Sequence, residues 1–383
     1  MKTAVAIVRC PTYDTAVLDR AVAEAVELAE MPDVRGKTVL LKPNILSASP
    51  PEKAISTRGE LLASFARLLK SRGAARIMAG ESPAFQSPKT AARRSGIAAA
   101  CEDEGVEWID FSTEAVYECP EGKRVKRFAF ASALKEADLL VSLPKLKTHR
   151  LMRYTGAIKN LFGLVPGLGK SGFHLRFPGA ADFGSMLVDI ALASKPAFCL
   201  MDAVVSMEGD GPANGRPVET GLVFASRDPL ALDWIAASVI GYDPFELAYL
   251  VDAASRGAWI SGPDDIEVRG LAISEARPDS FELLPPYSNA KFFTELLPPP
   301  LRRLVRDATV ARPFFDRDSC VRCGDCVKIC PPGALAFAPV DPVDGGKGSG
   351  SRRVRIDYGK CIRCYCCHEV CPADAISLRK RAF

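Results

Sequence analysis

Short apolar stretches alternate with amphipathic ones along the first three hundred residues. Runs rich in Val, Ile, Leu and Ala predict strands at residues 3–9, 38–44, 75–82, 106–111, 137–145, 197–207 and 220–226. Helical periodicity predicts helices at residues 14–30 with Asp14 as N-cap, at 57–73 ending at Gly73, and at 228–241. Strands this apolar, separated by helices, are typical of a mostly parallel sheet that helices cover. The pattern therefore predicts an α/β fold.

The pattern changes near residue 300, where three consecutive prolines and a polar stretch interrupt it. We expect an α/β substrate- or cofactor-binding domain over residues 1–300 and a linker over residues 301–313. A small α+β, two-cluster ferredoxin-like domain then occupies residues 314–383. Within it, a Gly-rich polar stretch at 341–353 predicts a flexible loop, flanked by two short strands, LAF and VRID.

Cysteines are concentrated at the end of the chain, with nine of the 13 after residue 319. Eight of them form two C-x2-C-x2-C-x3-C-P motifs, which begin at Cys320 and at Cys361. In bacterial ferredoxins with this spacing, three thiolates wrap one cluster and the fourth ligates the other cluster. The spacing predicts two [4Fe-4S] clusters, which makes the chain an electron-transfer protein.

The repeat also predicts which thiolates share a cluster. We assign one cluster to Cys320, Cys323, Cys326 and Cys371, and the other to Cys361, Cys364, Cys367 and Cys330. Zinc is the alternative metal, but its sites typically have two or four cysteines without this repeat. Cys366 is not needed by either motif, and we interpret it as a non-ligand beside a cluster.

Net charge and hydropathy indicate which partners the protein can have and where in the cell it is expected. The formal net charge is +4, and residues 314–383 supply it with 12 Lys and Arg against 8 Asp and Glu. Two bound clusters would neutralise most of this excess, so we expect no nucleic-acid partner. The sequence offers no apolar run long enough for a bilayer and no signal-peptide pattern at its start. We therefore expect a cytoplasmic protein with no membrane partner.

Polar residues follow four of the predicted strands at their carboxyl ends. They occur at Lys42–Asn44, at Glu81–Ser82, at Lys145–His149, and at Glu208 with Asp210. In open α/β sheets the ligand crevice lies outside the carboxyl ends of the strands. We therefore expect these residues to line a pocket, although unrelated surface loops are the alternative.

A Gly-rich, Lys-rich segment over residues 155–174 adds a candidate anion site. Backbone N–H groups and ammonium groups in such a segment favour phosphate or carboxylate. It contains Gly167, Gly169 and Gly172 in a G-x-G-x-x-G spacing, but the strand and helix of a dinucleotide fingerprint are missing around it. A flexible surface lid is an equal alternative. The substrate-binding candidates are Lys42, Asn44, Lys145, Lys147, Lys159, Asn160, Lys170 and His174.

Two histidines and two acidic residues are candidates for acid–base chemistry. His149, Glu208 and Asp210 are the predicted catalytic residues, since each can exchange a proton with a bound substrate. Together with His174 they form an alternative metal site. Ordinary structural histidines remain the alternative interpretation for His149 and His174.

Long stretches of the chain resemble a known family. KPNIL (42–46), SLPKLKTH (142–149), TGAIKNLFGLVPG (155–167), and MEGDGPANG (207–215) followed by ASRDPLALDWIA (225–236) are similar to the domain of unknown function 362 family. The resemblance covers roughly residues 1–290. Members are often fused to a ferredoxin module and are mostly described as iron–sulfur cluster-binding proteins. The resemblance implies the same domain division and no particular substrate.

These observations favour a reductase. Two electrons from a soluble donor such as a ferredoxin would pass through the cluster domain to an anionic small molecule in the α/β domain. Tethering the carrier to the pocket raises its effective concentration. The alternative is a non-enzymatic electron carrier or maturation partner that docks another protein. The sequence leaves an additional cofactor, such as a flavin or a further metal, undetermined.

Overall fold

The computed structural model describes residues 2–83, 86–167, 169–285, 309–339 and 352–380, together with residues 298, 301 and 305. The chain divides into two compact units. The first comprises Met1–Lys170 and Gly179–Leu284, and the second comprises Ser171–Pro178 and Pro285–Phe383. Residues 302–304 and 306–308 of the predicted linker lie outside the described residues, so the predicted boundaries at 300 and 313 stay predictions.

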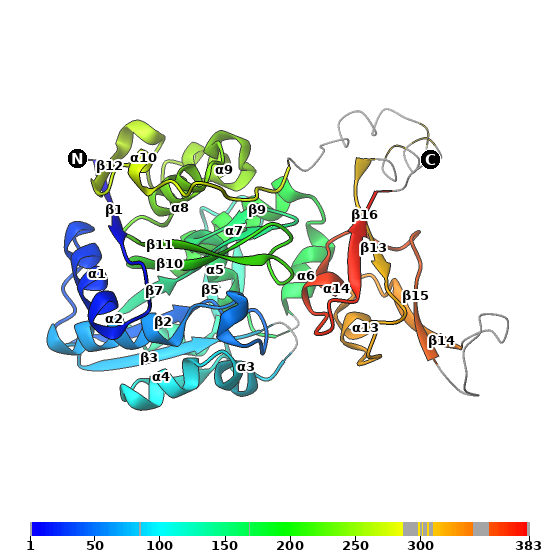
Figure 1. The fold of residues 1–383 in the computed structure, drawn as a ribbon, viewed down its shortest axis with the longest axis horizontal. Helices are drawn as coiled ribbons and strands as arrows, with labels where there is room; N and C mark the ends of the chain where they lie inside the picture. The colour runs from blue at the N-terminus through cyan, green and yellow to red at the C-terminus, as the bar shows by residue number, and fades with distance from the viewer. Residues whose placement is uncertain are drawn as a thin grey trace. The chain divides into compact units, whose positions relative to one another are not determined.

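The first unit is built on a ten-stranded sheet among the described residues, with an eight-strand path and two strands beside it (Figure 1). The path runs β12 (Ile266–Gly270), β1 (Thr3–Arg9), β11 (Arg216–Ser226), β10 (Phe198–Glu208), β7 (Leu139–Leu143), β2 (Thr38–Pro43), β3 (Arg76–Glu81) and β4 (Glu107–Asp110). Off this path, β8 (Lys145–His149) pairs with β10 and with β9 (Arg153–Thr155).

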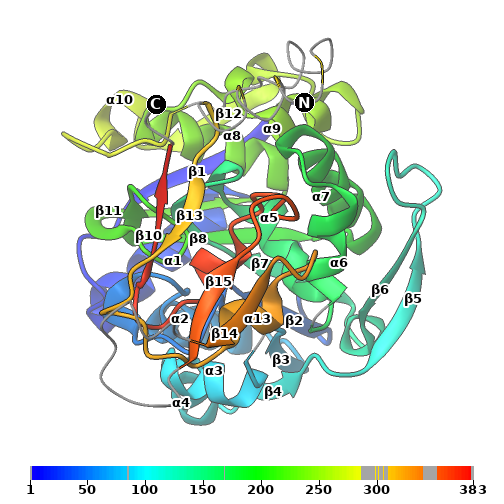
Figure 2. The same ribbon diagram turned by 90° about the vertical axis from the view of Figure 1, so that its right-hand side faces the viewer.

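Most of these strand pairs are parallel, which confirms the predicted fold class. The exceptions are β11, which is antiparallel to both β1 and β10, and the β8–β9 pair. The polar run at 145–149, expected only to follow the predicted strand at 137–145, is itself strand β8. A further hairpin, β5 (Glu114–Glu118) with β6 (Arg127–Ala131), extends away from the main sheet (Figure 2). The predicted strands at 3–9, 38–44 and 75–82 agree with the structure within one or two residues at each end.

The helices begin where the sequence places capping groups. Helix α1 (Thr15–Leu28) starts at Asp14, whose carboxylate accepts hydrogen bonds from the backbone N–H groups of Ala16 and Val17. Helix α8 (Pro229–Ile240) is capped by Asp228 in the same way, and Gly241 ends it at φ 102°. The remaining helices are α2 (Gly59–Ser71), α3 (Pro88–Arg94), α4 (Ile97–Asp103), α5 (Ala157–Asn160), α6 (Gly169–Arg176), α7 (Ala180–Ser194), α9 (Ala248–Ser255) and α10 (Ile273–Ala276).

The core of the first unit is apolar but includes long basic side chains. Phe65 of α2 stacks on Phe198 of β10 with ring centroids 6.5 Å apart. Lys42, Lys145 and Lys147 are buried to 0%, 0% and 2% exposure. Buried charges are costly unless they are paired and hydrogen-bonded, so the surroundings of these lysines mark the polar centre of this unit.

The second unit has the small α+β architecture predicted for it. Strand β13 (Arg312–Phe315) pairs with β16 (Ile376–Arg379), and β14 (Leu335–Pro339) pairs with β15 (Arg352–Ile356), both antiparallel. Helices α13 (Asp325–Ile329) and α14 (Cys366–Glu369) each lie within one cysteine motif. The two short strands predicted around the Gly-rich loop are β14 and β15, while residues 341–351 of that loop lie outside the described residues. Within the part of the chain that the structure describes, no helix is long and apolar enough to span a bilayer.

Candidate functional site

Four cysteines from both motifs line one pocket of the second unit. Its wall contains Cys320, Cys323 and Cys326 from the first motif and Cys371 from the second. Burial, and then the neighbouring thiols, raise the pKa of Cys326 to about 12. Since metal ligation requires thiolates, a bound cationic core would have to offset the cost of deprotonating these thiols.

A second pocket contains the other predicted set. Cys361, Cys364 and Cys367 line it together with Cys330 of the first motif, and the unassigned Cys366 is part of the same wall. The structure therefore brings the eight cysteines into the two groups of four that the spacing predicts. Each group takes three thiols from one motif and the fourth from the other.

The backbone around both groups fits a cluster. The N–H groups of Ala334 and Ala375 donate to the sulfurs of Cys330 and Cys371 at 3.2 Å and 3.3 Å. Arg322 and Arg363 occupy the same place in the two motifs and both have positive φ, 59° and 58°. N–H groups directed at sulfur stabilise the negative charge of a cluster and its ligands.

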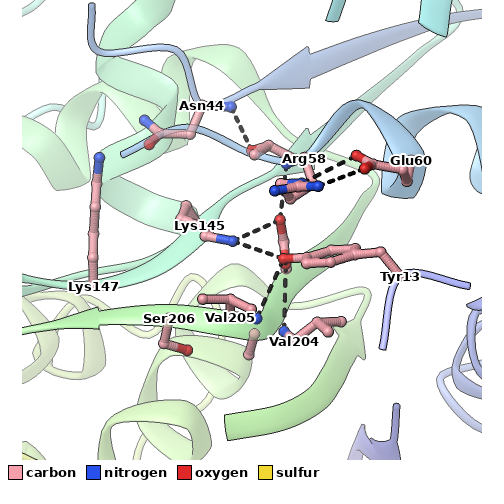
Figure 3. Close-up of polar contacts among 12 residues, drawn as sticks. Tyr13, Asn44, Arg58, Glu60, Lys145, Lys147, Val204, Val205 and Ser206 are labelled. Atoms are coloured by element: carbon pink, nitrogen blue, oxygen red, sulfur yellow. Dashed lines mark hydrogen bonds and ion pairs between the residues drawn. The ribbon is translucent and has the colours of Figure 1, made fainter. Parts of the chain in front are cut away.

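In the first unit, Lys145 and Asp202 form a fully buried ion pair at 2.9 Å (Figure 3). They face each other in register across β8 and β10. The hydroxyl of Tyr13 donates to Asp202 at 2.7 Å and accepts from the ammonium group of Lys145 at 3.0 Å. The N–H groups of Arg58 and Val205 complete the network, the first donating to Asp202 and the second to Tyr13.

The electrostatics of this network follow from its burial. Desolvation lowers the pKa of Lys145, although Asp202 acts in the opposite direction. Burial and the Asp202 carboxylate raise the pKa of Tyr13, which therefore stays a neutral hydroxyl. The guanidinium of Arg58 lies 4.6 Å from the centre of the Tyr13 ring and is held by Glu60. Tyr13 as a residue is half-buried, unlike Lys145 and Asp202.

A second buried ion pair joins Lys42 to Glu81 at the ends of β2 and β3. Lys42 also donates to the side-chain oxygen of Asn160 at 2.9 Å, and the Asn160 amide donates back to the Lys42 carbonyl at 2.8 Å. A Cβ atom on Gly163 would lie 2.1 Å from a Glu81 carboxylate oxygen and 2.5 Å from Lys42. Glycine at this position therefore lets the chain pass directly over the ion pair.

Lys170 lies beside the same group. Its ammonium group donates to the backbone carbonyls of Ser82 and Val165. Burial lowers the pKa of Lys170 to about 7, with Glu81 opposing the shift and Lys42 and Lys159 adding to it. The Ser82 hydroxyl accepts from the N–H of Gly167 at 2.7 Å. This part of the Gly-rich segment is thus tied to the sheet edge by hydrogen bonds.

Lys147 and Asn44 form a further group of polar side chains near the carboxyl ends of the strands. The ammonium group of Lys147 donates to the Ile55 carbonyl at 2.6 Å. The backbone N–H of Asn44 donates to the Thr57 hydroxyl at 2.9 Å. Figure 3 labels Asn44 and Lys147. The Asn44 side-chain oxygen is buried and has no hydrogen-bond partner among the described residues.

The predicted catalytic residues have different surroundings. Nδ1 of His149 accepts from the N–H groups of Leu151 and Met152 at 3.1 Å and 3.3 Å, so a neutral ring carries its proton on Nε2. Asp210 forms an ion pair with Arg150. Glu208 accepts from the backbone N–H of Glu282 at 2.6 Å and pairs with Arg216.

The two remaining candidates are His174 and Lys159. His174 belongs to Ser171–Pro178, which groups with the second unit, whereas Lys159 lies half-buried in α5 of the first unit. Among the described residues, no three His, Cys, Asp or Glu side chains are close enough together to hold a single metal ion. A cubane separates its thiolates more widely than one ion does, so this finding bears on the alternative metal site and not on the cysteine pockets.

Three residues that the sequence patterns did not single out are central to the hydrogen-bond networks of the first unit. Tyr13 and Asp202 complete the Lys145 network, and Asp233 of α8 holds the start of the Gly-rich segment. The Asp233 carboxylate accepts from the N–H groups of Ala157 and Ile158 at 2.5 Å and 3.0 Å. Burial raises the pKa of Asp233 to about 7. Asp202 and Asp233 each interrupt an apolar run, and that is the signal the sequence offers for them.

The fold and the cysteine pockets together define an α/β protein carrying a ferredoxin-type electron-transfer domain. The model of the family described as domain of unknown function (DUF362) matches residues 39–238, and a 4Fe-4S dicluster domain matches residues 319–375. The chain belongs to the DUF362 family, and its C-terminal region binds 4Fe-4S iron–sulfur clusters.

Two comparisons with individual proteins add to this. The chain is 34% identical over 210 residues to the thylakoid-associated protein sll1697 of Synechocystis sp., an alignment covering 55% of this chain. It spans 64% of that relative, which is less than two thirds of its length. A structure of the lactate racemase apoprotein from Thermoanaerobacterium thermosaccharolyticum aligns with a TM-score of 0.38 and 14% identity, covering 59% of this chain and 54% of that chain. This second likeness is too distant to carry an argument.

Proposed function

We propose that the protein is an iron–sulfur reductase that transfers electrons from two [4Fe-4S] clusters to an anionic small molecule bound by the α/β unit. The observation that carries the proposal is the pairing of two four-cysteine pockets with a sheet edge rich in buried lysines. The donor is a soluble carrier such as a ferredoxin, and a tail that is not strongly acidic allows an acidic one to dock.

We assign the cysteines of each pocket as the ligands of one cluster. Cys320, Cys323, Cys326 and Cys371 hold one cluster, and Cys361, Cys364, Cys367 and Cys330 hold the other. Each cluster, when bound, supplies a one-electron centre. The convergent thiols and the N–H groups directed at Cys330 and Cys371 support this assignment.

Proton supply comes from the α/β unit in this proposal. A two-electron reduction of an organic acid consumes two electrons, one from each cluster, and two protons. His149 donates from Nε2, since Nδ1 is occupied by two backbone N–H groups. The hydroxyl of Tyr13, a half-buried residue that Lys145 and Asp202 orient, relays a second proton. Lys159 attracts the anion, and Lys147 and Lys170, which donate to backbone carbonyls, add positive charge, whereas Glu81 and Asp202 offset the charges of Lys42 and Lys145.

The experiment that tests this proposal begins with anaerobic purification and analysis of iron, sulfide and other metals. Two clusters correspond to about eight irons. The protein is then reduced photochemically, and a panel of 2-oxo and 2,3-unsaturated carboxylates is added while the visible absorbance of the clusters is followed. Return of the oxidised spectrum with one carboxylate, and formation of its reduced product, supports a reductase. About four irons would refute the two-cluster assignment.

One observation favours a second candidate, a carrier that docks another protein. The ammonium groups of Lys42, Lys145 and Lys170 are each bound to protein acceptors. In a carrier these lysines stabilise a docking domain and bind no substrate. Reoxidation by a second iron–sulfur protein, with no response to any carboxylate in the panel, would favour this candidate over the reductase.

A further inference from the structure

The cysteine repeat provides an internal comparison between two nearly equivalent sites. Helices α13 and α14 begin at Asp325 and Cys366, which occupy the same position in the two motifs. The preceding residues, Gly324 and Tyr365, both have positive φ, 86° and 65°. Because the backbone is so similar, differences between the sites come mainly from side chains.

The first such difference is the arginine inside each motif. Arg363 is 3% exposed, lines the pocket of Cys361 and Cys364, and donates to the Val310 carbonyl at 2.6 Å. Arg322, at the equivalent position, lines the pocket of Cys320 and Cys323 but is exposed. A buried guanidinium acts on its neighbours through a low dielectric, whereas water screens an exposed one.

The second difference is the first residue of each helix. Cys366 is 6% exposed and lines the same pocket as Cys364, to whose sulfur its thiol can donate. The first site has the carboxylate of Asp325 in its place. A thiol donor stabilises added negative charge on a ligand sulfur, and a carboxylate opposes it.

We infer that the site of Cys361, Cys364, Cys367 and Cys330 has the higher reduction potential, because Arg363 and Cys366 stabilise its reduced state. One electron is accepted at each site, and each reduction adds one negative charge. The first site includes the exposed Cys323, and its greater contact with water works in the opposite direction. The carboxylate of Glu369 near Cys364 also works in the opposite direction. In this inference Arg363 outweighs both effects, because a buried guanidinium is little screened.

The consequence is a direction for electron movement within the second unit. An electron that enters at the exposed site of Cys323 comes to rest at the site of Arg363. The inference depends on the proposed two-cluster assignment, and the test must separate the two. We expect the singly reduced protein to hold its electron at the second site at least about ten times as often as at the first. For a one-electron couple this ratio corresponds to about 59 mV.

The test is an anaerobic, EPR-monitored titration of the full-length protein with dithionite and mediator dyes. It uses wild type, Arg363→Gln and the matched variant Arg322→Gln, each with its iron and sulfide content measured. We expect two waves in wild type. In R363Q the higher-potential wave moves down by the equivalent of tenfold or more, and in R322Q neither wave moves comparably.

Three outcomes would overturn the inference while leaving the two clusters in place. They are a single wave in wild type, movement of the lower-potential wave in R363Q, and equal shifts in R363Q and R322Q. If R363Q loads incompletely, Cys366→Ala removes only the thiol donor, and the same wave should move down. An iron content near four in wild type would instead mean that the proposed function has failed.

Discussion

Lys145 and Asp202 face each other in neighbouring strands β8 and β10, and their ion pair of 2.9 Å has no exposure to solvent. Breaking such a pair leaves one charge buried without compensation, which typically costs about 3–5 kcal/mol. Tyr13 depends on the same pair, because its hydroxyl bonds to both partners. This cluster therefore links the stability of the sheet to the orientation of a phenol.

Lys145→Met should lower the free energy of unfolding by about 3–5 kcal/mol, because Asp202 then stays charged and buried. Urea unfolding followed by tryptophan fluorescence measures this directly, since Trp108, Trp234 and Trp259 all lie in the first unit. The matched control is Glu107→Gln, which breaks the exposed Arg76–Glu107 pair and should have a much smaller effect, because water screens exposed pairs. The double variant K145M/D202N should recover part of the loss. Equal effects of K145M and E107Q would contradict this account.

Gly163→Ala should destabilise the first unit by roughly 1–3 kcal/mol, the usual range for overpacking a filled core. The new methyl group would meet Glu81 at 2.1 Å and Lys42 at 2.5 Å, and neither side chain is free to move away from a buried ion pair. Gly262→Ala is the control, since a Cβ there has no atom within 4 Å. If the unfolding midpoints of the two variants coincide, Gly163 is not a packing requirement.

The sequence predicted the strands, the capped helices and the two cysteine sets because each has a short-range signature. Apolar runs and the Asp14 and Asp228 caps depend on neighbouring residues, and the cysteine spacing encodes its own geometry. Strand β8 was missed because Lys145, Lys147 and His149 make it look like a polar loop. Its polar side chains are buried against distant partners instead, a pairing that periodicity does not record.

The candidate pocket was predicted only in part for a related reason. The polar residues do gather at the carboxyl ends of the strands, as Lys42 with Glu81 demonstrates. Their partners, however, come from far along the chain, as in the pairing of Tyr13 with Asp202. A single sequence contains no information on such pairs. It therefore could not show that ammonium groups expected to face a substrate donate to protein acceptors instead. The role of those lysines in binding a substrate stays a prediction.

His149→Asn separates a structural role of His149 from a chemical one. The side-chain oxygen of asparagine can replace Nδ1 as acceptor for the N–H groups of Leu151 and Met152, but nothing replaces Nε2–H. We expect reoxidation of the reduced protein by its carboxylate acceptor to slow by about 100- to 10,000-fold, with the iron content unchanged. His149→Ala, which loses both functions, should also unfold more easily. An undiminished rate in H149N would remove His149 from proton transfer.

Asp233→Asn should change how the stability of the first unit depends on pH. With the pKa of Asp233 at about 7 in the folded protein and about 3.9 when unfolded, the folded state keeps a proton that the unfolded state has already lost. The contribution of Asp233 to the free energy of unfolding is therefore greatest below about pH 4 and falls as pH rises to about 7. Each unit of pKa difference is worth about 1.4 kcal/mol.

In the D233N variant this dependence disappears, and the variant also loses an acceptor, because Ala157 and Ile158 donate to different carboxylate oxygens. Urea unfolding of both proteins near pH 5 and near pH 8 isolates the effect, since contributions from all other groups cancel in the difference. Wild type should exceed D233N by more at the lower pH. A difference that is constant, or that grows with pH, would mean that Asp233 is charged throughout and holds the Gly-rich segment as a carboxylate.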